Sequence, residues 1–179
     1  MNVNMEYKNL IEKLEDPSAE AVYKASDRLA ELGGGDKIND LIELLTHKNL
    51  ETKFLAARTL GRLEDNEAAF ESLIRAIHDP ENKTIQGDLV ATLEGYDLST
   101  AYVEIFKLYL FGTFKVSKLA KSFLDYKEFD ITPRVLKKAR KHWNHYTNNV
   151  KRDDSFALVK MEVEEMFLDL ESYIQEQLH

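Results

Sequence analysis

Seven basic residues recur at helical spacing in two neighbouring segments, and they are the side chains best suited to bind a ligand. The set is Lys115, Lys118, Lys121, Arg134, Lys137, Lys138 and Lys141. The last four follow an i, i+3, i+4, i+7 pattern, which places them on one face of a helix. Ammonium and guanidinium groups bind phosphates and carboxylates. The pattern therefore predicts a positive surface for an acidic protein or for a nucleic-acid backbone.

Two histidines on the same segment could hold part of a metal site. His142 and His145 are three residues apart, which can bring two imidazoles to one side of a helix. No carboxylate lies at helical spacing to complete the site, and Lys138 and Lys141 stand beside it instead. We therefore expect no metal here.

The sequence contains none of the motifs that usually carry catalysis. It has no Gly-rich phosphate loop, no nucleophile elbow and no His-Glu-x-x-His. It also has no cysteine, which excludes disulfides and thiolate sites and fits a reducing compartment such as the cytoplasm. Charges within residues 1–14 argue against a secretory signal, and no apolar run approaches the roughly 20 residues of a membrane span. We expect a non-catalytic cytoplasmic protein without a cofactor.

Apolar residues recur at helical spacing along most of the chain and predict an all-α fold. Ile38, Leu41, Ile42 and Leu45 illustrate the pattern. Breakers such as Asp16-Pro17 separate the periodic segments, and a proline after aspartate is typical of an N-cap followed by the first helical residue. The predicted helices are 4–15, 17–32, 36–46, 50–64, 66–78, 81–94, 98–111, 114–126, 131–147 and 153–177.

The helices also repeat in pairs. Residues 29–32 align with 60–63 at an offset of 31, and Leu60 matches Leu93 at an offset of 33. A period near 30 residues with two helices in each unit indicates a stacked α-solenoid, in which every pair buries its apolar faces against the neighbouring pairs.

One segment resembles the second helix of a HEAT repeat. It runs from Asn49 to Asp65, and Asp79-Pro80 is similar to the usual turn between paired helices of that family. The resemblance implies a right-handed stack of about five helix pairs, with repeats over residues 4–147. It also implies that the second helices, 17–32, 50–64, 81–94 and 114–126, line the concave side. Lys53 stands where the family often has an arginine that links successive layers.

Charge is segregated along the chain. Residues 1–112 have a net charge of −9, residues 113–152 of +8 and residues 153–179 of −7. The last segment also carries a broad apolar stripe that has to be buried. We expect helix 153–177 to cap the stack by folding back on helix 131–147, with Trp143 and Tyr146 touching the Phe156–Val163 end. Glu162, Glu164 or Glu165 should then approach basic residues of the 113–152 block.

These observations and the resemblance predict a single HEAT-like domain over residues 1–179 that binds another protein and is a monomer. An acidic partner would match the basic block. An adaptor, a regulator or a toxin-neutralising partner in a bacterium would fit. The alternative is nucleic-acid binding through residues 113–152, as in HEAT-like DNA glycosylases, although those are basic along the whole concave side. A remote alternative is a HEAT-like lyase that binds a tetrapyrrole. HEAT-like iron enzymes are disfavoured because none of the five histidines precedes a glutamate.

Overall fold

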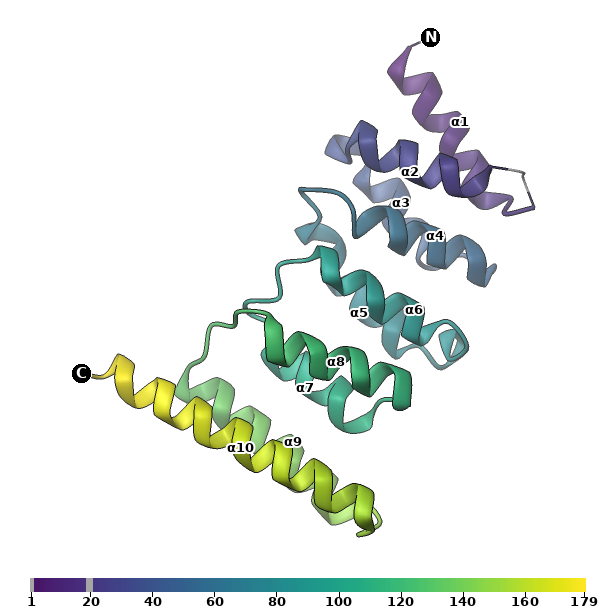
Figure 1. The fold of residues 1–179 in the computed structure, drawn as a ribbon. Helices are drawn as coiled ribbons and strands as arrows, with labels where there is room; N and C mark the ends of the chain where they lie inside the picture. The colour runs from purple at the N-terminus through teal and green to yellow at the C-terminus, as the bar shows by residue number, and fades with distance from the viewer. Residues whose placement is uncertain (1, 19–20) are drawn as a thin grey trace. The chain divides into compact units, whose positions relative to one another are not determined.

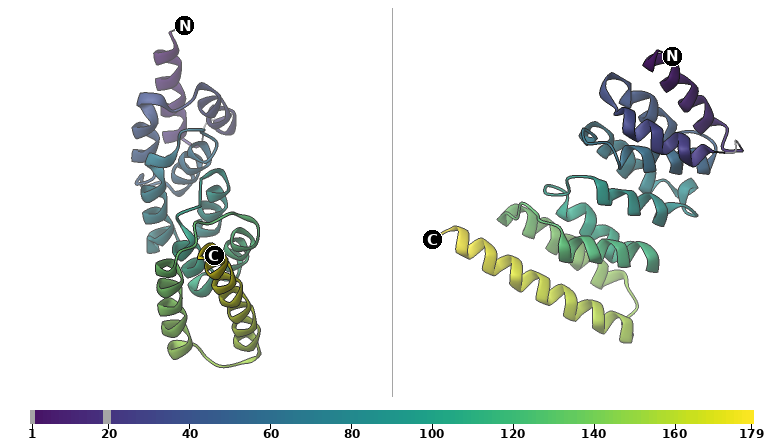
Figure 2. Two further views of the ribbon diagram at one scale, coloured as in Figure 1. Left: turned by 90° about the vertical axis from the view of Figure 1, so that its left-hand side faces the viewer. Right: turned by 45° about the horizontal axis from the view of Figure 1, so that its top comes forward.

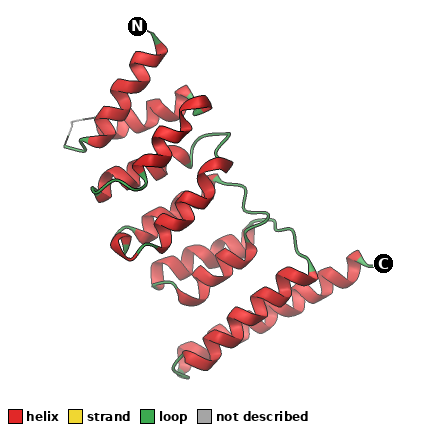
Figure 3. Ribbon diagram, turned by 180° about the vertical axis from the view of Figure 1, so that it is seen from behind, coloured by secondary structure: helices red, strands yellow, loops and turns green. Residues whose placement is uncertain are grey.

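The computed structural model describes residues 2–18 and 21–179, and every regular element within these ranges is helical (Figure 3). This confirms the predicted all-α class. The chain divides into two compact units, Met1–Asp97 and Leu98–His179. The single domain over residues 1–179 and the handedness of its curvature stay predictions.

The first unit consists of stacked helix pairs (Figure 1). Its helices are α1 (Val3–Glu15), α2 (Val22–Leu32), α3 (Ile38–Leu44), α4 (Leu50–Leu60), α5 (Phe70–His78) and α6 (Gln86–Ala91). Within each layer α1 packs on α2, α3 on α4 and α5 on α6. Between layers α2 packs on α4 and α4 on α6, so the second helices form one continuous row. The predicted pairing of helices is confirmed.

All but two of the described helices begin and end within four residues of their predicted bounds, and those two are shorter than the sequence pattern suggested. The helix expected from residue 17 begins at Val22, because the Asp16 carboxylate accepts hydrogen bonds from the backbone and hydroxyl of Ser18 and closes a turn. Residues 19 and 20 of that prediction lie outside the described residues. The helix expected over 81–94 consists of α6 between two 3-10 turns, Pro80–Asn82 and Thr92–Gly95.

Two layers of the first unit come into close backbone contact at two glycines. A Cβ on Gly95 would lie 1.6 Å from the carbonyl oxygen of Gly61, and one on Gly61 would lie 2.7 Å from that of Thr92. The Asn66 side chain bridges the same point by donating to the carbonyls of Leu60 and Gly95, both at 3.0 Å. Any larger residue at either glycine would therefore force the layers apart.

A buried lysine links two layers at the position where the family often has an arginine. Lys53 is buried, and its ammonium donates to Oδ1 of Asn82 at 2.7 Å. The Asn82 amide nitrogen in turn donates to the carbonyl of Ala76 at 2.8 Å. Lys53 and Asn82 thus provide a polar link between layers in place of a carboxylate–arginine pair.

The second unit contains the remaining four helices (Figure 2). They are α7 (Tyr102–Phe111), α8 (Phe114–Tyr126), α9 (Pro133–Asn149) and α10 (Asp154–Gln177). Helix α7 is central, because it packs against both α8 and α9. Its core side chains Ile105 and Phe106 are inaccessible to solvent.

Helix α10 folds back onto the rest of its unit, as predicted. The Trp143 ring stacks on Phe156 with centroids 6.2 Å apart, and Phe167 packs on Phe106 at 5.6 Å. The apolar stripe is buried only at its centre, at Val163 and Phe167, and the rest of it is half-buried or exposed. The expectation of a fully buried face was too broad, because α7 and α9 cover one side of α10 only.

The polar contacts of α10 differ from those expected. Glu162 accepts a hydrogen bond from the hydroxyl of Tyr109, and Glu164 lies beside Lys160 of its own helix. An ion pair between α9 and α10 joins Arg140 to Glu171, one turn after Phe167. Burial, together with the bonded Glu162 carboxylate, raises the pKa of Tyr109, so this phenol stays a hydrogen-bond donor at neutral pH.

Leu60 and Leu93 occupy matching positions in neighbouring layers, and replacing either one with alanine should destabilise the protein. Leu60 and Leu93 are both 0% exposed, so Leu60→Ala and Leu93→Ala should each lower the free energy of unfolding by about 2–5 kcal/mol. Urea denaturation measures the change. The exposed Leu168 serves as the control, because Leu168→Ala should cost less than about 0.5 kcal/mol. A loss below that value in both buried variants would contradict the repeat register.

Removal of α10 should expose the apolar surface that it covers. We expect the full chain to be monomeric and a chain ending at Asn149 to aggregate or lose stability, because Phe106 would lose its Phe167 contact. Size-exclusion chromatography with light scattering measures both states. A dimeric full chain and a well-folded monomeric truncation would show instead that α10 seals a dimer.

Candidate functional site

Helix α9 begins with a strong start signal that fixes its register. Thr132 is the N-cap and its hydroxyl accepts from the backbone of Val135 at 3.3 Å, while Pro133 occupies the first helical position. The helix then runs without interruption to Asn149. Its regular geometry displays Arg134, Lys137, Lys138 and Lys141 on the exposed side. The predicted basic stripe is therefore present on α9.

These four residues line one groove between α9 and the C-terminal half of α10. The groove has a volume of about 980 Å³. Its lining from α9 is Pro133, Arg134, Leu136, Lys137, Lys138, Arg140, Lys141 and Asn144, and its lining from α10 is Glu171, Ile174 and Gln175. Five cationic side chains thus face a single carboxylate.

That carboxylate is already engaged. Glu171 pairs with Arg140, and the Arg140 guanidinium also lies 4.9 Å from the centroid of the Phe167 ring. Leu136 and Ile174 supply an apolar part of the lining. The groove can therefore bind a ligand that combines negative charge with apolar side chains.

The three basic residues of α8 do not line this groove. Lys121 forms an ion pair with Asp125 at 2.6 Å, one turn later on the same helix. The Lys118 ammonium lies 5.6 Å from the centroid of the exposed Phe114 ring, and Lys115 is exposed. The structure therefore brings together four of the seven predicted residues, and a binding role for the other three stays a prediction.

A smaller pocket lies between α7 and α9 and contains both histidines. Its volume is about 420 Å³, and it is lined by Lys107, Phe111, Lys141, His142 and His145. Burial and the charge of Lys107 lower the pKa of His142, and Lys141 and His145 add to this effect. The described residues contain no group of three or more side chains suited to hold a metal ion. The two histidines thus face lysines rather than further ligands.

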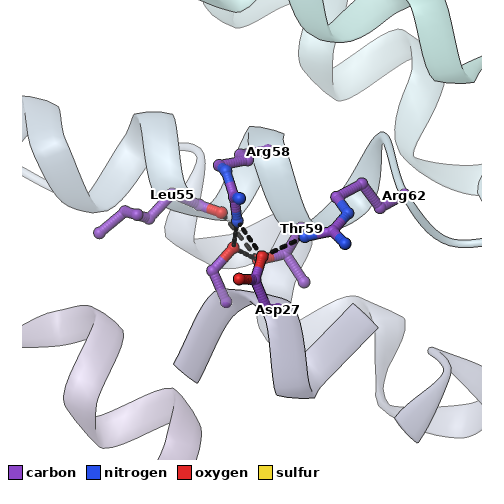
Figure 4. A network of polar contacts seen from close by, with 6 residues as sticks. Asp27, Leu55, Arg58, Thr59 and Arg62 are labelled. Atoms are coloured by element: carbon purple, nitrogen blue, oxygen red, sulfur yellow. Dashed lines mark hydrogen bonds and ion pairs between the residues drawn. The ribbon is translucent and has the colours of Figure 1, made fainter. Parts of the chain in front are cut away.

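The first unit contains a polar network on its row of second helices (Figure 4). Asp27 of α2 forms ion pairs with Arg58, at 2.8 Å, and with Arg62. Arg58 also donates to the Ser26 hydroxyl at 2.8 Å, and Ser26 shares a buried hydrogen bond of 2.9 Å with Thr59. The hydrogen bond from Arg58, supported by Arg62, lowers the pKa of Asp27. The network ties α2 to α4.

A second groove lies next to this network, between α4 and α6, with a volume of about 460 Å³. It includes Arg58 and Arg62, but also Asp88 and Glu94, so its charges are balanced. Its charged side chains favour neither an anion nor a cation, unlike those of the groove on α9, where one sign of charge dominates.

Sequence analysis missed three features of these sites. Arg140 was not singled out, although it lies three residues after Lys137 and therefore on an adjoining part of the same helix face. The Asp27 network could have been found from the i, i+4 spacing of Arg58 and Arg62 and from the repeat period of 31 that separates Asp27 from Arg58. Lys107 had no sequence signal, because its role depends on α7 packing on α9.

Comparison with known families supports the architecture of the first unit. Residues 7–94 match the family described as HEAT repeats. These residues are HEAT repeats. No curated protein and no solved structure matches the chain. HEAT repeats generally serve as protein-interaction modules, and they typically carry no catalytic activity of their own.

No helix in the described part of the chain has the length and the apolar character needed to cross a bilayer.

The Asp27 network should make the free energy of unfolding depend on pH in the acidic range. Because its partners lower the pKa of Asp27, the network stabilises the fold above the pKa of an unfolded aspartate, about 4, and this contribution is lost as the pH falls through the lower folded value. Asp27→Asn should therefore be less stable than the parent near neutral pH and equally stable in strong acid. Urea denaturation across this range measures the difference.

Asp65→Asn is the control, because Asp65 is exposed and lies outside the network. The difference in free energy of unfolding between Asp65→Asn and the parent should not disappear in acid in the same way. A destabilisation by Asp27→Asn that persisted unchanged in strong acid would contradict the ion-pair explanation and point to a steric effect.

Proposed function

We propose that this chain is a non-catalytic binding protein whose groove on α9 receives an acidic, amphipathic segment of another protein. The observation that carries the proposal is the composition of that groove, in which five cations face one carboxylate beside Leu136 and Ile174. The HEAT repeats of the first unit support a role in protein interaction.

Charge alone would not give a stable complex. An exposed ion pair contributes only about 0–1 kcal/mol, so four or five of them provide modest affinity and steep salt dependence. Apolar side chains of the partner that contact Leu136 and Ile174 would add about 25 cal/mol for each Å² of apolar surface removed from water. An amphipathic helix with acidic residues beside its apolar stripe meets both requirements.

A protein segment also explains the groove better than nucleic acid does. Duplex DNA carries one phosphate charge per roughly 1.7 Å and favours long tracks of positive charge. Here the predicted stripe on α8 does not extend the groove, and residues 1–112 are acidic. Nucleic-acid binding through residues 113–152 is the alternative outcome of the test below.

The cellular role that fits this proposal is that of an adaptor, a regulator or a toxin-neutralising partner in a bacterial cytoplasm, with the chain acting as a monomer. The absence of cysteine supports a reducing compartment. The lyase alternative requires a bound tetrapyrrole, and a colourless purified protein that leaves the absorption spectrum of an added tetrapyrrole unchanged would dispose of it.

A designed peptide tests the groove directly. The probe is a fluorescent helical peptide with Leu and Glu on adjoining faces, and anisotropy reports its binding. We expect Lys137→Gln, Lys138→Gln and Lys141→Gln together to weaken binding at least about tenfold, the loss of three charge-assisted contacts. Salt raised from about 50 to about 200 mM should weaken binding to the parent chain as well.

The matched control removes the same charge from α8 by combining Lys115→Gln, Lys118→Gln and Lys121→Gln. Because these residues lie outside the groove, this variant should bind the peptide nearly as well as the parent. Equal weakening by both triple variants would contradict the groove. Binding of duplex DNA but not of the peptide at low salt would establish the nucleic-acid alternative instead.

A further inference from the structure

One side of α10 exposes three large apolar side chains to solvent. Leu158, Met161 and Leu168 are between 63% and 68% exposed. Their i, i+3, i+10 spacing places them on one side of the helix, opposite the buried Val163 and Phe167. A single exposed apolar residue needs no explanation, but several on one face indicate a surface that a partner covers.

Carboxylates share this side of the helix with the apolar residues. They continue the same helical spacing, and all four are exposed: Asp154, Glu165, Asp169 and Glu176. Lys160, the one basic residue of α10, lies on another side of the helix beside Glu164. The three apolar residues and the four carboxylates together form the outer face of α10, which is therefore apolar and negatively charged at once.

Contacts elsewhere on α10 hold the helix in place. Glu162 accepts a hydrogen bond from the Tyr109 hydroxyl, Glu171 pairs with Arg140, and the Phe167 ring packs on the core of the unit. Because these contacts fix α10, its outer face is already ordered before a partner arrives. A partner that binds there does not have to order the helix first, which lowers the entropic cost of binding.

The charge of the outer face determines which partner fits it. A second copy of the same face would bring carboxylates against carboxylates, and like charges opposed across an interface weaken binding. A basic amphipathic helix instead places Lys or Arg side chains beside Glu165 and Asp169, while its apolar stripe covers the three apolar residues. The flexible side chain of Met161 suits such a contact, because it adapts to the shape of an apolar partner.

We propose that the outer face of α10 binds a basic amphipathic helix of another protein. The groove on α9 takes its α10 lining from Glu171, Ile174 and Gln175, so the two surfaces share no residue. The inference therefore stands independently of the acidic ligand proposed for the groove. A chain with both surfaces would join one acidic partner and one basic partner, as an adaptor does.

A fluorescent helical peptide with Leu and Lys on adjoining faces is the probe, and anisotropy reports its binding to the full chain. We expect Met161→Gln and Leu168→Gln together to weaken binding at least about tenfold, because both side chains lose their apolar contact with the peptide. The matched control combines Met5→Gln and Leu178→Gln, the same two replacements at exposed positions outside the face. Equal weakening by both double variants, or no weakening by the first, would overturn the proposal.

A second pair of variants tests the role of charge. Glu165→Gln together with Asp169→Asn should weaken binding about threefold or more, and should make it less sensitive to a rise in salt from about 50 to about 200 mM. Glu64→Gln together with Asp65→Asn removes the same charge from exposed positions in the other unit and should leave binding unchanged. Undiminished binding after loss of Glu165 and Asp169 would show that the face does not select a basic partner, and would overturn the proposal.

Two further measurements separate this surface from its alternatives. Light scattering at rising protein concentration detects self-association, and a dimer that Met161→Gln and Leu168→Gln dissociate would assign the face to a second copy of the chain instead. Binding of the acidic peptide to the groove should be unchanged in the same double variant, so failure of one surface is distinguishable from failure of the other.

Discussion

Leu55, Ala56, Ala57 and Leu60 of α4 are all inaccessible to solvent, although they point to different sides of the helix. A helix with this pattern needs apolar neighbours on more than one side, and α3, α2 and α6 provide them. No helix pair of the first unit would be stable alone, because each buries its apolar faces on the next pair. The direct backbone contact between Gly61 and Gly95 sets how closely these layers lie, and the polar links follow from that spacing.

The polar contacts between layers show how the layers stack although Lys53 replaces the arginine that HEAT repeats often carry. A buried lysine needs a hydrogen-bond partner, and Lys53 finds one in Asn82, whose amide is itself fixed by a backbone carbonyl. Asn66 plays the same part at the glycine contact. On the exposed side, Asp27 joins α2 to α4 through two arginines. Neutral amides thus serve as the partners of the buried groups, including the Lys53 ammonium, and charged pairs serve where water lowers the cost of desolvation.

Sequence periodicity predicted the helices well, because each apolar stripe reports the face that must be buried. It also predicted that α10 returns to α9 through Trp143, since so broad a stripe on a terminal helix requires cover. It failed where one side chain decides the local structure, as at Asp16, whose carboxylate closes a turn with Ser18 so that α2 begins at Val22 and not at residue 17. The basic stripe of α9 could be predicted from the sequence because all its members lie on one helix. The pocket at Lys107 could not be predicted, since it forms only when α7 and α9 pack together.

A chain with a net charge of −8 repels anions at long range. At physiological ionic strength, however, exposed charges are screened beyond about 8 Å, so a ligand responds to the side chains nearest to it rather than to the total. The groove on α9 gathers five cationic side chains in one lining, beside the apolar side chains of Leu136 and Ile174. The low-dielectric environment of these apolar side chains strengthens the local field. The net charge of the whole chain therefore says little about the ligand of this groove, because a carboxylate bound there would respond first to the cations of the lining.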